Sequence, residues 1–219
     1  YEIGVRLVGS EMCIRDRTQT HFASTSIQAL QALRRGEAIV FPTDTLFGLG
    51  VSVCHASSPE VLYEIKHREK GKPIAWLVSS VKALDTYGKN IPAYVYTLAK
   101  AFWPGPLTII VRANSNAPSA FCSDEGTVGL RMPANKIACK LIDELGCPIA
   151  TTSANISGQT NACSFAELDQ AVLDSVSVAL DDGVIKDGVA STVLDCTSCS
   201  HPRLLRIGAI TQTDIEFLL

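Results

Sequence analysis

Residues 41–50 combine a proline, two hydroxyls that flank a carboxylate, and two glycines, directly after the short apolar stretch 38–40. We interpret the apolar stretch as a buried strand, so these groups would lie at its carboxyl end, where open α/β sheets bind ligands. Pro42 fixes the direction in which the chain leaves the strand, and glycines let a ligand approach the backbone. The same residues could equally form a plain turn closed by local side-chain hydrogen bonds.

Basic side chains stand at the ends of two further predicted elements. Lys66 and Arg68 lie at the end of a helix that opens near Pro59, and Arg131 ends the apolar strand 127–131. The first pair could bind phosphate, or it could be a solvated helix end whose charge favours the helix macrodipole. An arginine that leaves an apolar strand needs an anionic partner, which could be a ligand or the carboxylate of Asp44.

Hydroxyl and amide side chains follow the same arrangement. Ser153 and Asn155 come directly after the predicted strand 148–151, and Ser191 precedes the predicted strand 192–194. Each could hydrogen-bond a bound molecule, although turn caps and strand starts also favour such residues. The sequence lacks a P-loop, a G-x-G-x-x-G fingerprint, a H-E-x-x-H metal pair and a G-x-S-x-G elbow. It is therefore not predicted to be a P-loop ATPase, a dinucleotide enzyme, a zinc protease or a serine hydrolase.

Taken in order, seven motifs resemble those of the YrdC/TsaC family, the threonylcarbamoyl-AMP synthases. The resemblance runs from about Ile27 to Gly208, which is most of the chain. The motifs are Pro-Thr-Asp-Thr at 42–45, Lys-His-Arg at 66–68, Trp-Pro-Gly-Pro-Leu-Thr at 103–108, Arg-Met-Pro at 131–133, Ser-Ala-Asn at 153–155, Ser-Thr at 191–192 and Leu-Arg-Ile-Gly at 205–208.

The resemblance implies a role for ten residues. Lys66 and Arg68 would be the catalytic residues, and no residue would hold a metal. The residues implied for threonine are Thr45, Arg131, Ser153 and Ser191, and those implied for ATP are Lys66, Arg68, Lys72, Gly129, Asn155 and Arg206. The chain departs from the family pattern at Asp44, where a glutamate is usual, at Glu69, where a proline is common, and at Leu77, where some relatives carry a histidine.

The implied reaction joins L-threonine, bicarbonate or CO2, and ATP into threonylcarbamoyl-AMP, with release of pyrophosphate, for t6A modification of tRNA. It would use Mg²⁺ and occur in the cytoplasm, away from membranes. The tRNA threonylcarbamoyl-transferase machinery would be a partner, and tRNA is a candidate partner. One alternative is a non-catalytic module that binds double-stranded RNA or tRNA. A second is a carbamoyl-adenylating domain of hydrogenase maturation, although such domains normally sit in much longer chains.

The composition fits a globular enzyme with a large core. The chain has 219 residues, of which 47% are hydrophobic, and a formal net charge of −3. This balance argues against a general nucleic-acid-binding surface, and no apolar run reaches the length of a membrane span. The eight cysteines are irregularly spaced, so we expect reduced, mostly buried thiols. Cys196 and Cys199 form a lone C-x-x-C, which we interpret as an ordinary loop because zinc sites need a second pair.

We expect the chain to divide into a short extension and one folded domain. Residues 1–17 lack periodicity and fall outside the resemblance, so we expect a disordered or artefactual extension. Residues 18–219 would form one YrdC-like domain of the short, single-domain form. Helices alternate with strands throughout it, which predicts an α/β fold with an open, twisted, mixed sheet flanked by helices around a concave cleft.

Local signals give several element boundaries. Residues 24–26 could cap a helix that Gly36 ends, and Ser164 and Glu167 could form a capping box for a helix that runs to about Leu173. Asn135 and Gly146 would bound an amphipathic helix, and Thr211 or Thr213 would cap the last one. The long irregular stretch 113–126 is a candidate lid over the site or an ordinary surface loop.

Overall fold

The computed structural model describes residues 5–6, 19–69, 71 and 74–219, with side chains from residue 25 onward within these ranges. The described strands form one mixed sheet in the order β1-β8-β2-β3-β7-β4-β6-β5-β9-β10. The strand bounds are β1 Val5–Arg6, β2 Ile39–Pro42, β3 Phe47–Ser52, β4 Ala75–Leu77, β5 Leu107–Arg112, β6 Thr127–Arg131, β7 Ile149–Ser153, β8 Val178–Leu180, β9 Thr192–Asp195 and β10 Arg203–Arg206. The helix bounds are α1 Gln19–Arg34, α2 Glu60–Ile65, α3 Ala83–Tyr87, α4 Ala93–Phe102, α5 Lys136–Leu145, α6 Gln170–Asp174 and α7 Gln212–Glu216, with short 3-10 turns η1 Ser119–Phe121 and η2 Phe165–Glu167.

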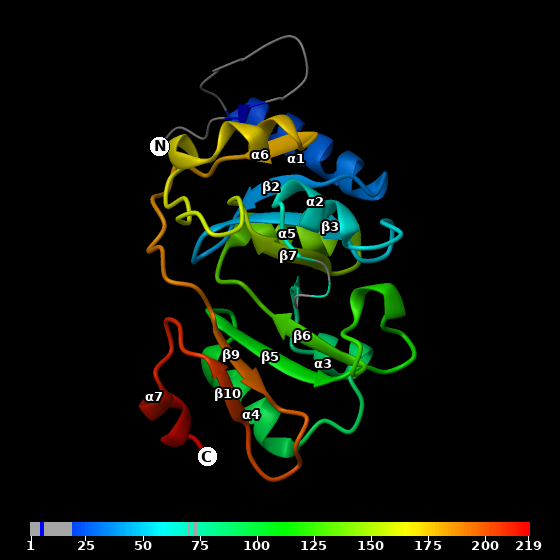
Figure 1. The fold of residues 1–219 in the computed structure, drawn as a ribbon, viewed down its shortest axis with the longest axis vertical. Coiled ribbons are helices and arrows are strands. Elements are labelled where there is room, and N and C mark those ends of the chain that lie inside the picture. Colours follow the sequence, from blue (N-terminus) through cyan, green and yellow to red (C-terminus); the bar gives the residue numbers. More distant parts are fainter. Residues whose placement is uncertain (1–4, 7–18, 70, 72–73) are drawn as a thin grey trace.

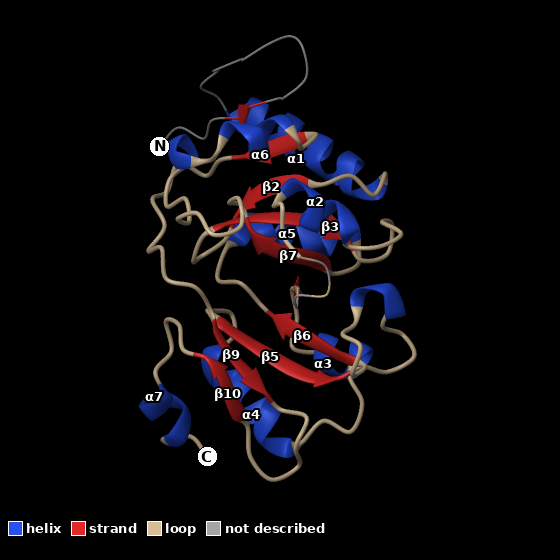
Figure 2. Ribbon diagram, viewed as in Figure 1, coloured by secondary structure: helices blue, strands red, loops and turns tan. Residues whose placement is uncertain are grey.

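The sheet has two parts (Figure 1). We call strands β1, β8, β2, β3 and β7 the β2 half, and strands β6, β5, β9 and β10 the β5 half. The three-residue strand β4 joins them, because it pairs antiparallel with β7 and parallel with β6. Parallel pairs also join β2 to β8 and β5 to β9, so the predicted mixed α/β sheet is confirmed. Figure 2 shows the strands of both halves in red, with helices on either side.

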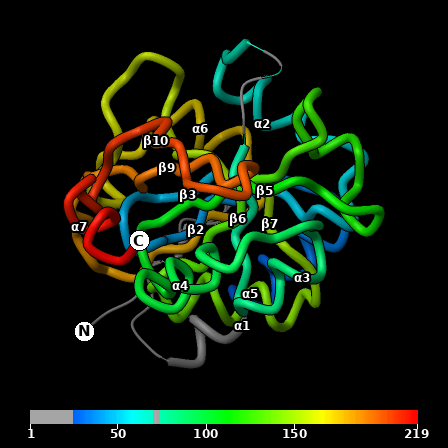
Figure 3. The backbone as a smooth tube through the Cα atoms, turned by 90° about the horizontal axis from the view of Figure 1, so that it is seen from below, coloured from blue at the N-terminus to red at the C-terminus, as the bar shows by residue number. Residues whose placement is uncertain are grey.

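Helices cover the sheet on both faces. Seen from below in Figure 3, α1, α3, α4 and α5 lie on one side of the strands, and α2 and α6 lie on the other. Side chains alternate along β2 accordingly: Ile39 and Phe41 pack in the core under α1 and α5, whereas Val40 packs in the core on the other side. Burial of these apolar faces holds the halves together as a folded unit.

Helix α5 begins and ends where the sequence predicts. The Asn135 side chain accepts hydrogen bonds from the backbone N–H groups of Ile137 and Ala138, and Gly146 adopts φ 77° at the other end. Thr211 caps α7 through a capping box with Asp214. The predicted cap at residues 24–26 is wrong, because α1 begins at Gln19 and runs through them. Hydroxyl residues are tolerated within helices as well as at their starts, so their presence does not fix the boundary.

The predicted helix opened by Ser164 is also wrong. The Ser164 hydroxyl does bond the Glu167 carboxylate, but only the single 3-10 turn η2 follows. Helix α6 is a separate element capped by Asp169, whose side chain accepts from the Ala171 N–H. The capping signal is therefore real, but the apolar spacing after it does not sustain a continuous helix.

The glycine-containing run after β2 folds back as strand β3, which pairs with β2 in a hairpin. A Cβ on Gly50 would lie 2.7 Å from Ile149 Cγ2 and 2.9 Å from the Phe41 ring, and one on Gly48 would lie 2.9 Å from Thr151 Cγ2. These glycines therefore leave room over β3 for the Phe41 ring from the neighbouring strand β2. The prediction that they serve ligand approach does not account for Gly50, although Gly48 also lines the cleft described below.

Two further expectations concern less regular segments. The candidate lid, residues 113–126, is anchored by Phe121, which is buried and whose carbonyl accepts from the Trp76 indole N–H at 3.2 Å. Closure by this loop stays a prediction. The predicted extension, residues 1–17, lies outside the described residues except for Val5 and Arg6, which pair with Leu180 and Ala179 at the sheet edge.

Candidate functional site

A cleft of about 950 Å³ lies between the β2 half and the β5 half. Its lining comes from the β2–β3 turn, the end of α2, and strands β4, β5, β6, β7, β9 and β10. Lys72 falls outside the described residues. The other predicted site residues all line this cleft: Thr45, Lys66, Arg68, Gly129, Arg131, Ser153, Asn155, Ser191 and Arg206.

Arg131, at the end of β6, is the most firmly held of these side chains. Its Nη2 donates to Asp44 Oδ1 at 2.6 Å and to Thr45 Oγ1 at 3.1 Å, and its Nε donates to the Gly105 carbonyl at 3.2 Å. The Asp44 pair predicted as an alternative partner is therefore present. In the described part of the chain, Nη1 donates to no protein acceptor, and no fully buried side-chain nitrogen or oxygen lacks a partner. Nη1 is thus open to the cleft, where a carboxylate could accept from it.

The β2–β3 turn places Thr45 beside this arginine. Thr43 Oγ1 donates to the Leu46 carbonyl at 2.6 Å and accepts from the Leu46 N–H at 3.2 Å. These bonds close the turn, as the plain-turn interpretation expects. They also leave the Thr45 hydroxyl buried between Thr43 and Arg131. The turn therefore positions Thr45 beside Arg131. The plain-turn interpretation is confirmed, and ligand binding by this segment stays a prediction.

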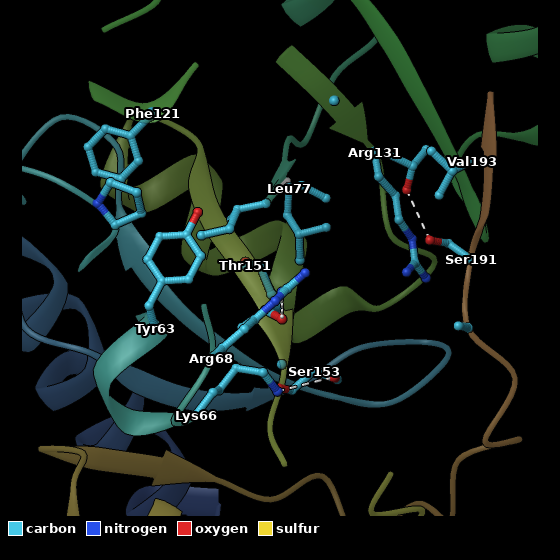
Figure 4. A pocket seen from close by; sticks show the side chains of 18 of the residues that line it. Tyr63, Lys66, Arg68, Leu77, Phe121, Arg131, Thr151, Ser153, Ser191 and Val193 are labelled. Carbon is cyan, nitrogen blue, oxygen red and sulfur yellow. Dashed lines mark hydrogen bonds between the residues drawn. The ribbon is translucent and has the colours of Figure 1, made fainter. Parts of the chain in front are cut away.

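Ser191 and Arg206 form a second polar group on the β5 half. Arg206 donates twice to the Ser191 carbonyl, at 2.8 and 3.0 Å, and once to its hydroxyl at 3.0 Å. The Thr108 hydroxyl lies 3.0 Å from the Ser191 hydroxyl. Figure 4 shows Ser191 near Arg131, apart from Lys66 and Arg68. The resemblance implies threonine for Ser191 and ATP for Arg206, whereas the structure places the two side chains in contact. Thr108, to which the sequence motifs gave no role, lies in the same group.

Lys66, the residue after α2, is buried and already saturated with hydrogen bonds. Its ammonium donates to the carbonyls of Ser153 and Asn155, and to Asn155 Oδ1 at 2.9 Å. Burial, with a smaller contribution from Arg68, lowers the pKa of Lys66 to about 8. Ser153, predicted for threonine, lies in this group, and its hydroxyl donates to Asn155 Oδ1 at 2.6 Å. The lysine thus fixes the turn after β7, and a phosphate would have to compete for its protons.

Two arginines on opposite sides of the cleft carry positive charge. Arg68 donates to Thr152 Oγ1 at 3.2 Å, and among the described residues neither Arg68 nor Arg206 forms an ion pair with a carboxylate. Burial lowers the pKa of Arg206, and the charge of Arg68 lowers it further. Guanidinium groups arranged in this way suit a polyphosphate, which can accept from both.

Carboxylates are scarce in the cleft. Glu60 and Asp124 are its lining carboxylates, and the described residues contain no group of three His, Cys, Asp or Glu side chains that could hold a metal. A Mg²⁺ ion would therefore fit here mainly through ligand phosphates, as this ion commonly does. No helix within the described ranges has the length and apolar character needed to span a membrane.

Comparison with known proteins gives a consistent set of relatives. The model of the Sua5/YciO/YrdC family, described as "Telomere recombination", matches residues 31–208. A threonylcarbamoyl-AMP synthase of Pyrococcus abyssi is 36% identical over 184 residues, which cover 84% of this chain and 54% of the relative. One of Bacillus subtilis is 35% identical over 193 residues, which cover 88% and 56%. This chain thus spans about half the length of these two relatives.

A solved structure shares the fold over nearly the whole chain. The crystal structure of P. abyssi Sua5 complexed with L-threonine superposes with a TM-score of 0.84 at 34% sequence identity. The match covers 93% of this chain and 59% of the Sua5 chain. The predicted open α/β fold is therefore confirmed by a structural neighbour as well as by the sheet order.

Proposed function

This chain belongs to the Sua5/YciO/YrdC family, and from that premise we propose that it makes threonylcarbamoyl-AMP from L-threonine, bicarbonate or CO2, and ATP. The proposal rests on three arginines that line one cleft. Arg131 Nη1 has no acceptor among the described residues, and Arg68 and Arg206 form no ion pair with a described carboxylate. The first suits the carboxylate of an amino acid, and the others suit phosphates. The enzyme would be a nucleotidyltransferase that serves t6A modification in the cytoplasm.

The residues act in this scheme by binding and alignment. Arg131 and Thr45 hold threonine so that its amine faces dissolved CO2, and the amine nitrogen attacks the carbon to give a carbamate after loss of a proton. A carbamate oxygen then attacks the α-phosphorus of ATP, and the bond from that phosphorus to the pyrophosphate oxygen breaks. Arg68 and Arg206 stabilise the phosphate charge that shifts to the leaving pyrophosphate. Mg²⁺, brought by ATP, supplies further charge neutralisation.

Lys66 has a different place in this proposal from that implied by the resemblance alone. Its contacts support a role in which it fixes Ser153 and Asn155 at the end of β7, next to Arg68. A direct phosphate contact from Lys66, and the assignment of Lys72, stay predictions. Gly129 lines the cleft, and a Cβ there would lie 3.3 Å from Thr108 Cγ2, so a side chain would press on the neighbouring strand β5.

Pyrophosphate release tests the proposal. We expect release that requires threonine, bicarbonate and Mg²⁺ together, with threonylcarbamoyl-AMP identified by mass. Release that ignores threonine would contradict it. The non-catalytic alternative is tested in parallel by binding to double-stranded RNA and tRNA. We expect weak binding at physiological salt, because the chain has a net charge of −3.

A further inference from the structure

Two thiols face each other at the end of the β3–β7 pair that is remote from the cleft. Cys54 follows β3 and is exposed, whereas Cys147 precedes β7 and is buried. Neither lines the cleft, and neither has a part in the proposed reaction. The pair therefore needs a separate account.

The ladder between β3 and β7 brings these two cysteines to the same end of the sheet. The antiparallel pairing runs from Gly48 opposite Ser153 to Ser52 opposite Ile149. A last hydrogen bond of 3.0 Å runs from the Val53 N–H to the Pro148 carbonyl, and residues 53–55 then form a turn closed by the Ala56 N–H on the Ser52 carbonyl. Cys54 and Cys147 are the neighbours in sequence of Val53 and Pro148, at the point where both segments leave the ladder.

The two thiols interact with each other. A side-chain hydrogen bond with Cys147 is one cause of the raised pKa of Cys54, and the two residues directly adjoin the bonded Val53 and Pro148. A disulfide needs Cα atoms roughly 4.4–6.8 Å apart, a separation that residues next to a cross-strand hydrogen bond can reach.

A serine and a histidine adjoin the buried thiol. Ser52 Oγ lies 3.2 Å from Cys147 Sγ and 2.8 Å from His55 Nδ1. This chain of contacts gives the Cys147 proton a route through the serine hydroxyl to the imidazole, which reaches the surface. A buried thiol with such a route can be deprotonated when it attacks.

We propose that Cys54 and Cys147 form a reversible disulfide when the protein meets a two-electron oxidant such as hydrogen peroxide. The Cys54 sulfur attacks one peroxide oxygen, the O–O bond breaks, and Cys54 becomes a sulfenic acid as water leaves. Cys147 then attacks the Cys54 sulfur, the S–O bond breaks, and a second water leaves with the Cys147 proton. Two thiols are oxidised to one disulfide and one peroxide is reduced to two waters.

The surroundings set the character of this bond. Burial and the neighbouring Cys147 raise the pKa of Cys54 to about 12, so little of it is thiolate at neutral pH and the first step is slow. The same effect disfavours the Cys54 thiolate that reduction would release, so the disulfide should resist reduction once formed. It would close a long loop of chain and tie β3 to β7, which stabilises the fold chiefly through the unfolded state.

Oxidation of the full chain tests the proposal. The wild-type protein is treated with hydrogen peroxide, alkylated, digested and mapped by mass spectrometry, before and after reduction. We expect one crosslinked peptide pair that joins Cys54 to Cys147, a melting temperature several degrees higher than that of the reduced protein, and full reversal by dithiothreitol. Cys54→Ser and Cys147→Ser should each lose both the crosslink and the thermal shift.

Matched variants separate this pair from general thiol chemistry. Cys199→Ser removes another exposed cysteine and should leave the crosslink unchanged. Ser52→Ala should slow crosslinking several-fold while leaving its site unchanged, because the proton route is lost. Crosslinks that form equally among other cysteines would overturn the proposal. So would oxidation of Cys54 that stops at sulfinic acid in a protein whose melting curve shows it to be folded.

Discussion

Substitutions in the ion pair between Arg131 and Asp44 should separate the contribution of each residue to stability from its contribution to ligand binding. The N–O distance of this pair is 2.6 Å, and the two side chains are 8% and 15% exposed. Arg131→Met leaves the Asp44 carboxylate buried and unpaired, a change that costs about 3–5 kcal/mol in other buried pairs. For a chain of this size, that corresponds to a drop in melting temperature of roughly 6–20 °C.

Asp44→Asn should be milder. The amide oxygen still accepts from Arg131 Nη2, and Thr45 and Gly105 continue to hold the guanidinium. We expect a loss of about 1–2 kcal/mol, because a charge-assisted hydrogen bond becomes a neutral one. The double variant should lose less than the sum of the single variants, by about 1–3 kcal/mol, since the residues are in contact.

Ligand binding distinguishes the two residues. Arg131→Met should weaken threonine about 10- to 150-fold, the equivalent of roughly 1.5–3 kcal/mol, because Nη1 no longer meets the carboxylate. Asp44→Asn should change threonine affinity by less than about threefold, within roughly 0.7 kcal/mol. Calorimetry with threonine and with ATP, beside thermal unfolding of each variant, gives all the values. If Asp44→Asn lost threonine as severely as Arg131→Met, Asp44 itself would be the ligand-binding group and our assignment of Nη1 would be wrong.

Arg68→Ala should weaken ATP about 10-fold or more by calorimetry and leave threonine largely intact, whereas Arg203→Ala, which removes an exposed β10 arginine outside the cleft, should change neither. An equal loss of ATP affinity in both variants would mean that these arginines act only through long-range charge. ATP affinity should fall as pH rises through about 8, because Lys66 is protonated below that pH and loses one of its three N–H donors above it. Lys66→Met should remove this fall in affinity from the pH profile. A fall of the same size in that variant would exclude Lys66 as its source. Gly50→Ala should lower stability by about 1–3 kcal/mol in denaturant unfolding, since its Cβ would overlap Ile149 and Phe41, and an unchanged midpoint would show that β7 can shift.

The sequence predicted which side chains line the cleft, because these residues sit in short motifs at the ends of strands. Arg131, Ser153 and Ser191 each follow or precede an apolar run, and sheet topology brings such ends together. Helix α5 was equally predictable, since its caps and its apolar stripe agree.

Grouping within the site could not be predicted. Ser153 was expected with threonine and Ser191 apart from Arg206, yet the structure joins Ser153 to Lys66 and Ser191 to Arg206. Those contacts depend on which strands are neighbours in the sheet, and local propensity carries no such information. Strand β3 was missed for a related reason: its glycines disfavour a strand locally, and only the Phe41 ring on the neighbouring strand explains them.

The narrow junction at β4 has a thermodynamic consequence. Only three residues of that strand connect the hydrogen-bond ladders of β7 and β6, while Thr45 belongs to the β2 half and Arg131 to the β5 half. Arg131 already links the halves through Asp44 and Thr45. A molecule that touches both halves adds to this link and further limits how far the ladders can twist against each other, so a second molecule binds a protein that is already restrained. Occupancy by one ligand should therefore tighten the other, and by linkage the factor is the same in either order of addition.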